Sequence, residues 1–322
     1  MKRRLIRLGI VAVVASFLML NVVAYFHAWR MTHFLASGKR TASPEKLSVA
    51  GKMVTLVRGV DVPKPLVHPA GTEFPQPART VRFVARDGVS LEAWDIQSAA
   101  PAVGVVVMFH GYAVSRSSLL GEARVLHDLG WRTVLVDFRG SGGSDGSVTT
   151  LGWREAEDVA AAASWARREW PQSRLMLYGV SMGAAAVLRA LATENVRPEA
   201  IILECPFDTL LTTVRHRYRV MGLPAFPFAE LLVFWGGFQH GFNAFRLNPV
   251  DYASSVTCPA LVLDGESDPF VHPAEVRRVA AAMQGSTECH VFAGGSHGGY
   301  WRDVPEEYRK TMADWLATVP LH

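Results

Sequence analysis

Largely apolar runs alternate with helical patterns along most of the chain, and this alternation limits the folds that the chain can adopt. Six such runs follow one another after residue 100: Val103–Phe109, Thr133–Phe138, Leu175–Val180, Ala200–Leu203, Ala260–Leu263 and Cys289–Phe292. Helical patterns lie between or after them, near residues 117–129, 155–169, 182–193, 274–284 and 305–317. Strands that are apolar on both faces and separated by helices are typical of a parallel sheet with helices on both sides. Two shorter strand patterns, Thr80–Arg86 and Ser90–Ile96, flank an Asp-Gly pair and indicate a hairpin.

The 322 residues divide into three predicted parts. We predict an N-terminal membrane anchor over residues 1–37, a linker and lead-in over residues 38–79, and one α/β domain over residues 80–322. Residues 206–250 do not fit the alternation of strands and helices, and we interpret them as a cap inserted into the α/β domain.

The predicted anchor rests on an uncharged run, Leu8–Trp29. Its first nineteen residues, 8–26, are nearly all apolar and as a helix would extend about 28 Å, close to the hydrocarbon thickness of a bilayer. The run is longer than the apolar part of a typical secretory signal and ends in aromatic residues, so we favour an uncleaved single-pass helix. A cleaved signal and a buried soluble helix are the alternatives.

Charge predicts the orientation of this helix and argues against one class of partner. Four basic residues precede the run and three follow it, which favours a cytoplasmic N-terminus and a non-cytoplasmic catalytic domain. The net charge of +4 comes from residues 1–40, because the rest of the chain has 26 basic against 29 acidic residues. That balance leaves no basic stripe for phosphates, so we do not expect nucleic-acid binding.

The strongest local motif is Gly179-Val180-Ser181-Met182-Gly183, which follows an apolar strand pattern and opens an alanine-rich helix. A serine on such a sharp strand-to-helix turn adopts strained backbone geometry, and the flanking glycines are needed because a Cβ atom there would clash. The turn exposes the hydroxyl at a helix N-terminus, where developing negative charge is favoured. We therefore predict that Ser181 is a nucleophile.

A nucleophilic serine needs a base and an acid that orients the base. The loops after the last two predicted strands contain Asp268 and His297, and both loops leave the same edge of a parallel sheet as the serine turn. We predict that His297 accepts the proton of Ser181 and that Asp268 orients His297. Asp264 and Glu266 are neighbouring alternatives to Asp268. Asp208 is a further substitute, although we expect it to cap the helix that begins at Thr209.

A serine hydrolase also needs donors for the oxyanion of its tetrahedral intermediate. His110-Gly111-Tyr112 follows the strand pattern Val103–Phe109, and a glycine there would let the backbone turn its N–H groups toward the serine. We assign the oxyanion hole to the backbone N–H groups of Met182 and Tyr112. His110 is expected to order the loop rather than to act as a ligand or a second base.

Several ordered motifs together resemble the α/β-hydrolase superfamily, and most closely its serine aminopeptidase-like and monoacylglycerol lipase-like branch. They are His110-Gly111, Asp137–Gly146, the serine turn and Asn248–Tyr252, and the resemblance covers residues 80–318. It implies the α/β-hydrolase fold: a mostly parallel eight-stranded sheet with helices on both faces, a Ser–Asp–His triad and a helical cap after the sixth strand. The predicted transmembrane helix precedes this domain and lies outside the resemblance.

We expect a serine hydrolase that cleaves an ester, thioester or amide of a small-molecule acyl substrate, with an esterase- or lipase-like activity favoured. The alternatives are a serine peptidase of the aminopeptidase type and a catalytically silent binding module. No cofactor is expected, because the glycine-rich loop 140–146 matches no nucleotide-binding pattern. A metal site is also not expected, because metal-ligand spacings are absent. The three cysteines exclude a disulfide scaffold, and we expect Cys258 and Cys289 to be separate thiols.

The predicted cap is rich in aromatic residues, with nine in residues 206–250. Apolar residues repeat at helical spacing in two stripes, Leu210 to Met221 and Leu231 to Phe238. The plainer interpretation is that these stripes pack the cap onto the rest of the domain. The alternative is that they form an apolar wall for an acyl or aromatic part of the substrate.

Overall fold

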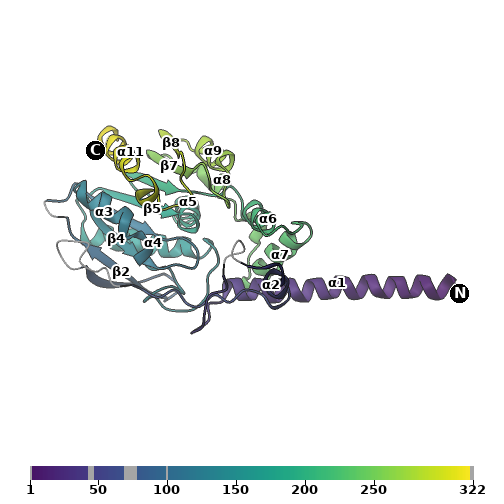
Figure 1. Ribbon diagram of the computed structural model, residues 1–322. Helices are drawn as coiled ribbons and strands as arrows, with labels where there is room; N and C mark the ends of the chain where they lie inside the picture. Colours follow the sequence, from purple (N-terminus) through teal and green to yellow (C-terminus); the bar gives the residue numbers. More distant parts are fainter. Residues whose placement is uncertain (1, 43–46, 69–77, 99–100, 320–322) are drawn as a thin grey trace. The chain divides into compact units, whose positions relative to one another are not determined.

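The computed structural model describes residues 2–42, 47–68, 78–98 and 101–319 (Figure 1). The predicted linker and lead-in therefore lies partly outside the described residues. The described chain groups into two compact units, each built from two segments. One unit contains Met1–Pro63 and Leu210–Arg246, and the other contains Lys64–Thr209 and Leu247–His322.

The second unit is built on an eight-stranded sheet with the strand order β1-β2-β4-β3-β5-β6-β7-β8. Strand β2 is antiparallel to both of its neighbours, and the remaining strand pairs are parallel. The strands are β1 (Arg79–Val84), β2 (Ser90–Ile96), β3 (Val105–Phe109), β4 (Arg132–Val136), β5 (Leu175–Val180), β6 (Ala200–Glu204), β7 (Ala260–Gly265) and β8 (Thr287–Phe292).

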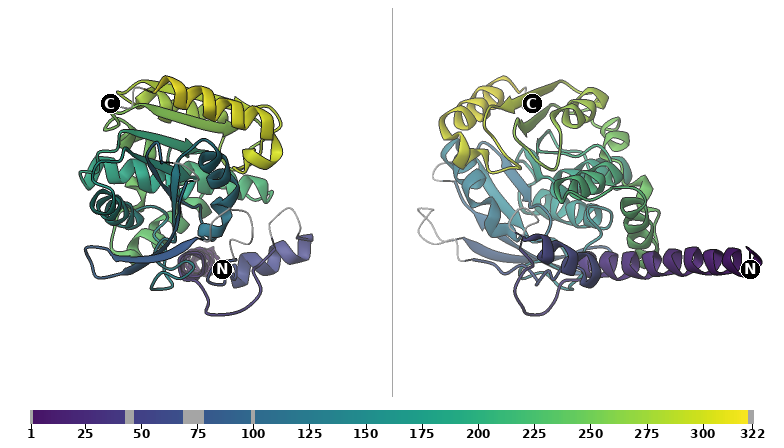
Figure 2. Two further views of the ribbon diagram at one scale, coloured as in Figure 1. Left: turned by 90° about the vertical axis from the view of Figure 1, so that its left-hand side faces the viewer. Right: turned by 45° about the vertical axis from the view of Figure 1, so that its right-hand side comes forward.

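Helices cover both faces of this sheet, which is why its central strands are apolar on both sides. One group consists of α3 (Leu120–Asp128), α10 (Tyr300–Asp303) and α11 (Pro305–Thr318), with the short 3-10 helix η2 (Arg116–Leu119) ahead of α3. The other group consists of α4 (Glu155–Glu169), α5 (Met182–Thr193), α8 (Pro249–Ala253) and α9 (Pro273–Ala282). Figures 1 and 2 show α11 and α9 on opposite sides of β8.

Alternate residues of the strands divide between the two helical layers. Val106, Met108 and Tyr178 belong to the core cluster that also contains Leu126 of α3 and Met312 of α11. All five side chains are buried. This period of two follows from the pleat of a strand. The predicted α/β-hydrolase architecture is therefore confirmed, and β2, β5, α4 and α5 have the predicted bounds.

Part of the predicted lead-in belongs to the second unit through backbone contacts. The Lys64 Nζ donates hydrogen bonds to the carbonyl oxygens of Ser144 and Gly146, at 2.8 and 2.9 Å. The Ser115 hydroxyl donates to the carbonyl oxygen of Leu66, at 2.8 Å. These bonds hold an extended, proline-containing segment against the loops that follow β3 and β4.

The first unit is helical in its described part. It contains α1 (Lys2–Thr32), α2 (Val49–Arg58), α6 (Leu210–Val220), α7 (Phe228–His240) and the 3-10 helix η3 (Ala244–Arg246). Among the described residues, α1 is the one helix that is long and apolar enough to cross a membrane. Helix α2 lies in the predicted linker, where no helix was expected, and the Ser48 hydroxyl caps it by accepting a hydrogen bond from the Gly51 N–H, at 3.1 Å.

Candidate active site

Three loops at one edge of the sheet contain the candidate residues predicted from the sequence. Ser181 lies between β5 and α5, Asp268 follows β7, and His297 follows β8. These strands are parallel, with β6 between β5 and β7. Their C-terminal ends therefore meet at the same edge, which is where ligand sites form in open α/β sheets.

The structure brings these three side chains into one chain of hydrogen bonds. The His297 Nε2 lies 3.0 Å from the Ser181 Oγ, and the His297 Nδ1 lies 2.6 Å from the Asp268 Oδ2. Because a carboxylate accepts, the imidazole Nδ1 is the protonated nitrogen, which leaves Nε2 free to accept from the serine hydroxyl. The imidazole thus has the tautomer that a general base for Ser181 requires.

Asp268 is positioned independently of its histidine. Its second oxygen, Oδ1, accepts hydrogen bonds from the backbone N–H groups of Phe270 and Val271, at 2.7 and 3.0 Å. Its side chain is fully buried, whereas the His297 side chain is 20% exposed. The ring of Phe270 also meets His297 edge-on, with ring centroids 5.3 Å apart. The carboxylate is therefore fixed, while the imidazole remains accessible.

The serine turn has the strained geometry that the motif predicted. Ser181 has a φ of 53°, a conformation that costs energy for a residue with a side chain. A Cβ on Gly179 would lie 2.6 Å from the backbone of Gly183, and one on Gly183 would lie 2.3 Å from the Phe109 carbonyl oxygen. Both glycines are thus required by close backbone approach, which holds Ser181 at the tip of the turn.

The loop after β3 is ordered by His110, as expected. The His110 Nε2 accepts a hydrogen bond from the Phe138 N–H, at 3.2 Å, so its Nδ1 donates to the Gly111 carbonyl oxygen, at 2.7 Å. Both ring nitrogens are engaged, and burial lowers the pKa of His110, which keeps the imidazole neutral. The buried histidine therefore ties the loop after β3 to the end of β4.

Gly111 lies beside the serine, as predicted, and its role in turning the loop stays a prediction. Gly111 is not among the residues with positive φ, whereas Ala113 is, at 56°. A Cβ on Gly111 would make ordinary contacts, 3.6 Å from the Val180 carbonyl oxygen and 3.8 Å from the Ser181 Cβ. The positive φ of this loop therefore lies at Ala113, and the assignment of the oxyanion hole to the N–H groups of Tyr112 and Met182 stays a prediction.

Within the described residues, His297 makes no hydrogen bond to any of the three acids considered as alternatives to Asp268. The Asp208 Oδ2 accepts from the Arg278 guanidinium, at 2.6 Å, and its Oδ1 accepts from the Thr209 N–H, also at 2.6 Å. Glu266 is exposed. Asp264 is buried, and neither of its carboxyl oxygens has a hydrogen-bond partner among the described residues. Burial and the nearby charge of Asp268 raise the pKa of Asp264 to about 7.

Sequence reasoning missed Glu204, which contacts the site from the end of β6. Its backbone carbonyl accepts from the Ser181 N–H, at 2.8 Å, and its buried side chain accepts from the Tyr178 hydroxyl. A Cβ on Gly298, next to His297, would lie 3.7 Å from the Glu204 Oε2. The sequence did contain a signal for Glu204, because it is the one charged residue of an otherwise apolar, buried strand.

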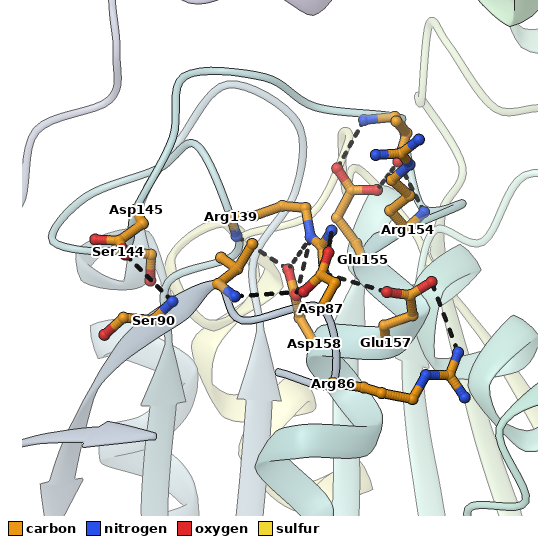
Figure 3. Close-up of polar contacts among 12 residues, drawn as sticks. Arg86, Asp87, Ser90, Arg139, Ser144, Asp145, Arg154, Glu155, Glu157 and Asp158 are labelled. Carbon is orange, nitrogen blue, oxygen red and sulfur yellow. Dashed lines mark hydrogen bonds and ion pairs between the residues drawn. The ribbon is translucent and has the colours of Figure 1, made fainter. Parts of the chain in front are cut away.

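The loop Asp137–Gly146 is held by ion pairs and hydrogen bonds rather than left open for a ligand. Figure 3 shows the Arg139 guanidinium between two carboxylates, at 2.7 Å from both Asp158 and Asp87. The same figure shows the Ser90 N–H donating to Asp145, at 3.3 Å. The loop thereby links the hairpin turn at Asp87 to the start of α4.

One group of described residues has side chains close enough to share a metal ion, and it overlaps the hydrogen-bonded chain. Its potential ligand atoms, from Cys205, Asp268 and His297, all lie within 4.8 Å of one another. Both nitrogens of His297 already have hydrogen-bond partners, Asp268 and Ser181. The donor set is therefore poorly suited to a metal ion. All three cysteines are free thiols, including Cys258 and Cys289.

Comparisons with known proteins agree with this architecture. Residues 100–224 match the family model described as Hydrolase_4, serine aminopeptidase S33. The uncharacterized protein YqkD of Bacillus subtilis is 25% identical over 217 residues, which cover 66% of this chain and 70% of that protein. Lysophosphatidylserine lipase ABHD12 of Danio rerio is 29% identical over 192 residues, which cover 55% of this chain and 47% of that protein. The esterase Pf2001 of Pyrococcus furiosus matches in structure with a TM-score of 0.65 and 24% identity, over 79% of this chain and 96% of that one.

The sheet order, the serine turn and these matches together identify the class of protein. The chain has the α/β-hydrolase fold, and the family and sequence matches support its membership of the α/β-hydrolase superfamily. Its relatives there include lipases and esterases.

Proposed function

We propose that this protein is a membrane-anchored serine hydrolase that cleaves a carboxylic ester, thioester or amide through an acyl-serine intermediate on Ser181. The observation that carries the proposal is the unbroken hydrogen-bonded chain from Ser181 through His297 to Asp268. It joins three residues that are 29 and 116 positions apart in the sequence. Such a chain is the recurring arrangement of acyl-transfer enzymes that use serine.

In the acylation step, the Ser181 Oγ attacks the substrate carbonyl carbon while the His297 Nε2 takes the hydroxyl proton. Asp268 stabilises the resulting imidazolium and keeps its orientation. The N–H groups of Met182 and Tyr112 bind the oxyanion. As the tetrahedral intermediate collapses, His297 returns the proton to the leaving alcohol, thiol or amine.

In the deacylation step, His297 removes a proton from water, which attacks the acyl carbon. The bond to the Ser181 Oγ breaks, and His297 gives the proton back to the serine. The acid leaves, and the site returns to its starting state. No atom changes its oxidation state in this cycle, and each proton moves through a residue of the chain. The reaction therefore needs no cofactor.

For the substrate, we propose an ester with an apolar acyl part, as in a lysophospholipid. Lipase relatives that act on lysophosphatidylserine support this class. The aromatic-rich composition of residues 206–250 supports it as well. Helix α1 supports the membrane anchor. The basic residues ahead of its apolar run favour a cytoplasmic N-terminus and a catalytic domain on the other side.

Turnover of p-nitrophenyl esters of increasing chain length by the full-length protein in detergent tests the proposal. We expect medium-chain esters to be preferred over acetate, and activity to fall to background in Ser181→Ala. Full turnover by Ser181→Ala would reject the serine mechanism. A tenfold preference for short, charged esters would reject the apolar substrate class.

Serine aminopeptidase activity is the second candidate, because the matching family model has that description. Aminoacyl p-nitroanilides separate the two candidates. A peptidase would release nitroaniline from them, whereas an esterase or lipase would leave them intact. A silent binding module would turn over neither substrate.

A further inference from the structure

Helix α7 of the cap packs against the predicted membrane helix α1 through small residues. The side chains of α1 that are buried are Ala24, Ala28 and Thr32, which repeat every four residues along one face. A Cβ on Gly236 of α7 would lie 4.0 Å from the Ala28 Cβ. Small residues at this spacing let two helix backbones approach closely, as helices do inside membranes.

Two side-chain hydrogen bonds fix the position of α7 along α1. The Trp235 indole N–H donates to the Asn21 side-chain oxygen, at 3.1 Å, and the Gln239 amide donates to the Tyr25 carbonyl oxygen, at 2.7 Å. The Asn21 amide in turn donates to the Phe17 carbonyl oxygen, at 2.9 Å. The side-chain amides of Asn21 and Gln239 and the Trp235 indole N–H thus all donate to partners within the two helices, as burial in lipid requires.

Asn21 lies inside the apolar run, five residues before its end at Phe26. A helix rises about 1.5 Å per residue, so Asn21 is about 7 Å inward from that end. The hydrogen bond from Trp235 therefore places this part of α7 within about 7 Å of the outer end of the apolar run, close to the level of the lipid headgroups. Tryptophan and tyrosine favour this depth because one end of each ring system is apolar and the other is polar.

Five aromatic rings connect the two helices into one surface, made of Tyr25 and Phe26 of α1 and Phe234, Trp235 and Phe238 of α7. Tyr25 meets Phe26 and Trp235 edge-on, with centroids 5.6 and 5.4 Å apart. Trp235 in turn meets Phe234 and Phe238, at 5.1 and 5.4 Å. Phe234 is 47% exposed and Phe238 is 66% exposed, so the second predicted stripe of the cap is not packed away in a core.

We propose that α7 lies in the membrane, with Phe234 and Phe238 inserted among the acyl chains of the bilayer that α1 spans. The continuity of this aromatic surface with the exposed apolar face of α1 identifies the partner as lipid rather than protein. The inference rests on the proposed anchor, and it extends that anchor from one helix to two. It also gives the cap direct contact with lipids of the class proposed as substrates.

The accessibility of spin labels in phosphatidylcholine vesicles tests this placement. The full-length protein is used with Cys258→Ser and Cys289→Ser, so that a single introduced cysteine is labelled at Phe234 or Phe238. Matched controls are Val11→Cys on α1 and Val84→Cys on β1, both of which are exposed positions. Each label is scored by collisions with oxygen, which concentrates in lipid, and with a nickel chelate, which stays in water.

We expect the oxygen-to-nickel collision ratio at 234 and 238 to match position 11 and to exceed position 84 about tenfold, because polar solutes are excluded from hydrocarbon. A ratio like that of position 84 would overturn the inference. Low collisions with both reagents would overturn it too, because they would place these residues against protein, such as a second copy of the chain. If position 11 itself behaves like position 84, the anchor fails as well, so the two failures are distinguishable.

Discussion

Asp268 is fixed by two backbone N–H groups on one oxygen and by His297 on the other. Asp208 has a superficially similar place after β6, yet its carboxylate binds Arg278. The two acids therefore form a matched pair, one that holds the imidazole and one that holds a surface guanidinium. Exchanging either carboxylate for an amide changes little volume and tests the role of its charge.

We expect Asp268→Asn to lower kcat by about 10⁴-fold, because the amide stabilises the wrong imidazole tautomer. Asp208→Asn should change kcat only a few-fold, because the ion pair that it removes involves neither Ser181 nor His297. Steady-state ester hydrolysis measures both effects. Equal losses in the two variants would remove Asp268 from its proposed role.

Glu204 introduces a pH dependence of stability at this site. Burial raises the pKa of Glu204 to about 7, against the opposing effect of hydrogen bonds from Tyr178 and Tyr308, and above the ordinary 4.5. The folded protein therefore binds this proton more tightly than the unfolded chain does. The stability that Glu204 contributes is fully present below pH 4.5 and is lost as the pH rises through 7.

Glu204→Gln should therefore leave the unfolding midpoint nearly unchanged at pH 4 and raise it at pH 8, with a free-energy effect on the order of 1–3 kcal/mol. Thermal unfolding of the detergent-solubilised protein across this pH range measures the difference. Glu266→Gln is the control, because Glu266 is exposed on the same edge of the sheet. A midpoint difference that is constant with pH would contradict the expected titration.

At the scale of elements, the serine turn depends on how closely β5 and α5 approach β3. A Cβ on Gly183 would lie 2.3 Å from the Phe109 carbonyl oxygen, whereas one on Gly111 would have its nearest neighbour at 3.6 Å. The backbone cannot move aside as a flexible side chain does, so the clash at Gly183 could be relieved only by shifting β3 or α5.

Gly183→Ala should consequently lower the free energy of unfolding by about 2 kcal/mol or more. Gly111→Ala should leave it nearly unchanged. Urea unfolding followed by circular dichroism compares the two variants. If both glycines tolerate alanine equally, the close approach is not what the turn requires.

The sequence predicted those helices and strands whose apolar pattern and end signals lie within the element itself. Strand β5 and helix α5 could be placed because apolar runs and glycines mark their ends, and the parallel order then brought Asp268 and His297 to Ser181. It did not predict the pairing of Trp235 with Asn21, because these residues are 214 positions apart and nothing periodic links them. Glu204 was passed over because the predicted strand ended at Leu203, one residue before this single charged position of β6.

For the whole molecule, the charges around α1 determine the expected orientation in the membrane. Lys2, Arg3, Arg4 and Arg7 precede the apolar run, and only Arg30 lies in the last turn of the helix. Basic residues are retained on the cytoplasmic side. The bulk of the chain should therefore lie on the opposite side.

A C-terminal alkaline phosphatase fusion should be active in a bacterial host, because this reporter folds only outside the cytoplasm. A matched fusion to green fluorescent protein should be dark, because that reporter becomes fluorescent only when it stays in the cytoplasm. A bright fluorescent fusion with an inactive phosphatase would reverse the proposed orientation.

The most direct test of the central claim is to map the adduct of a fluorophosphonate on the full-length protein by mass spectrometry. The proposed mechanism predicts a single phosphonyl group on the peptide that contains Ser181. It also predicts that labelling disappears in Ser181→Ala and falls to background in His297→Ala. Absence of an adduct on the folded wild-type protein, or undiminished labelling in Ser181→Ala, would contradict the proposal that Ser181 is an activated nucleophile.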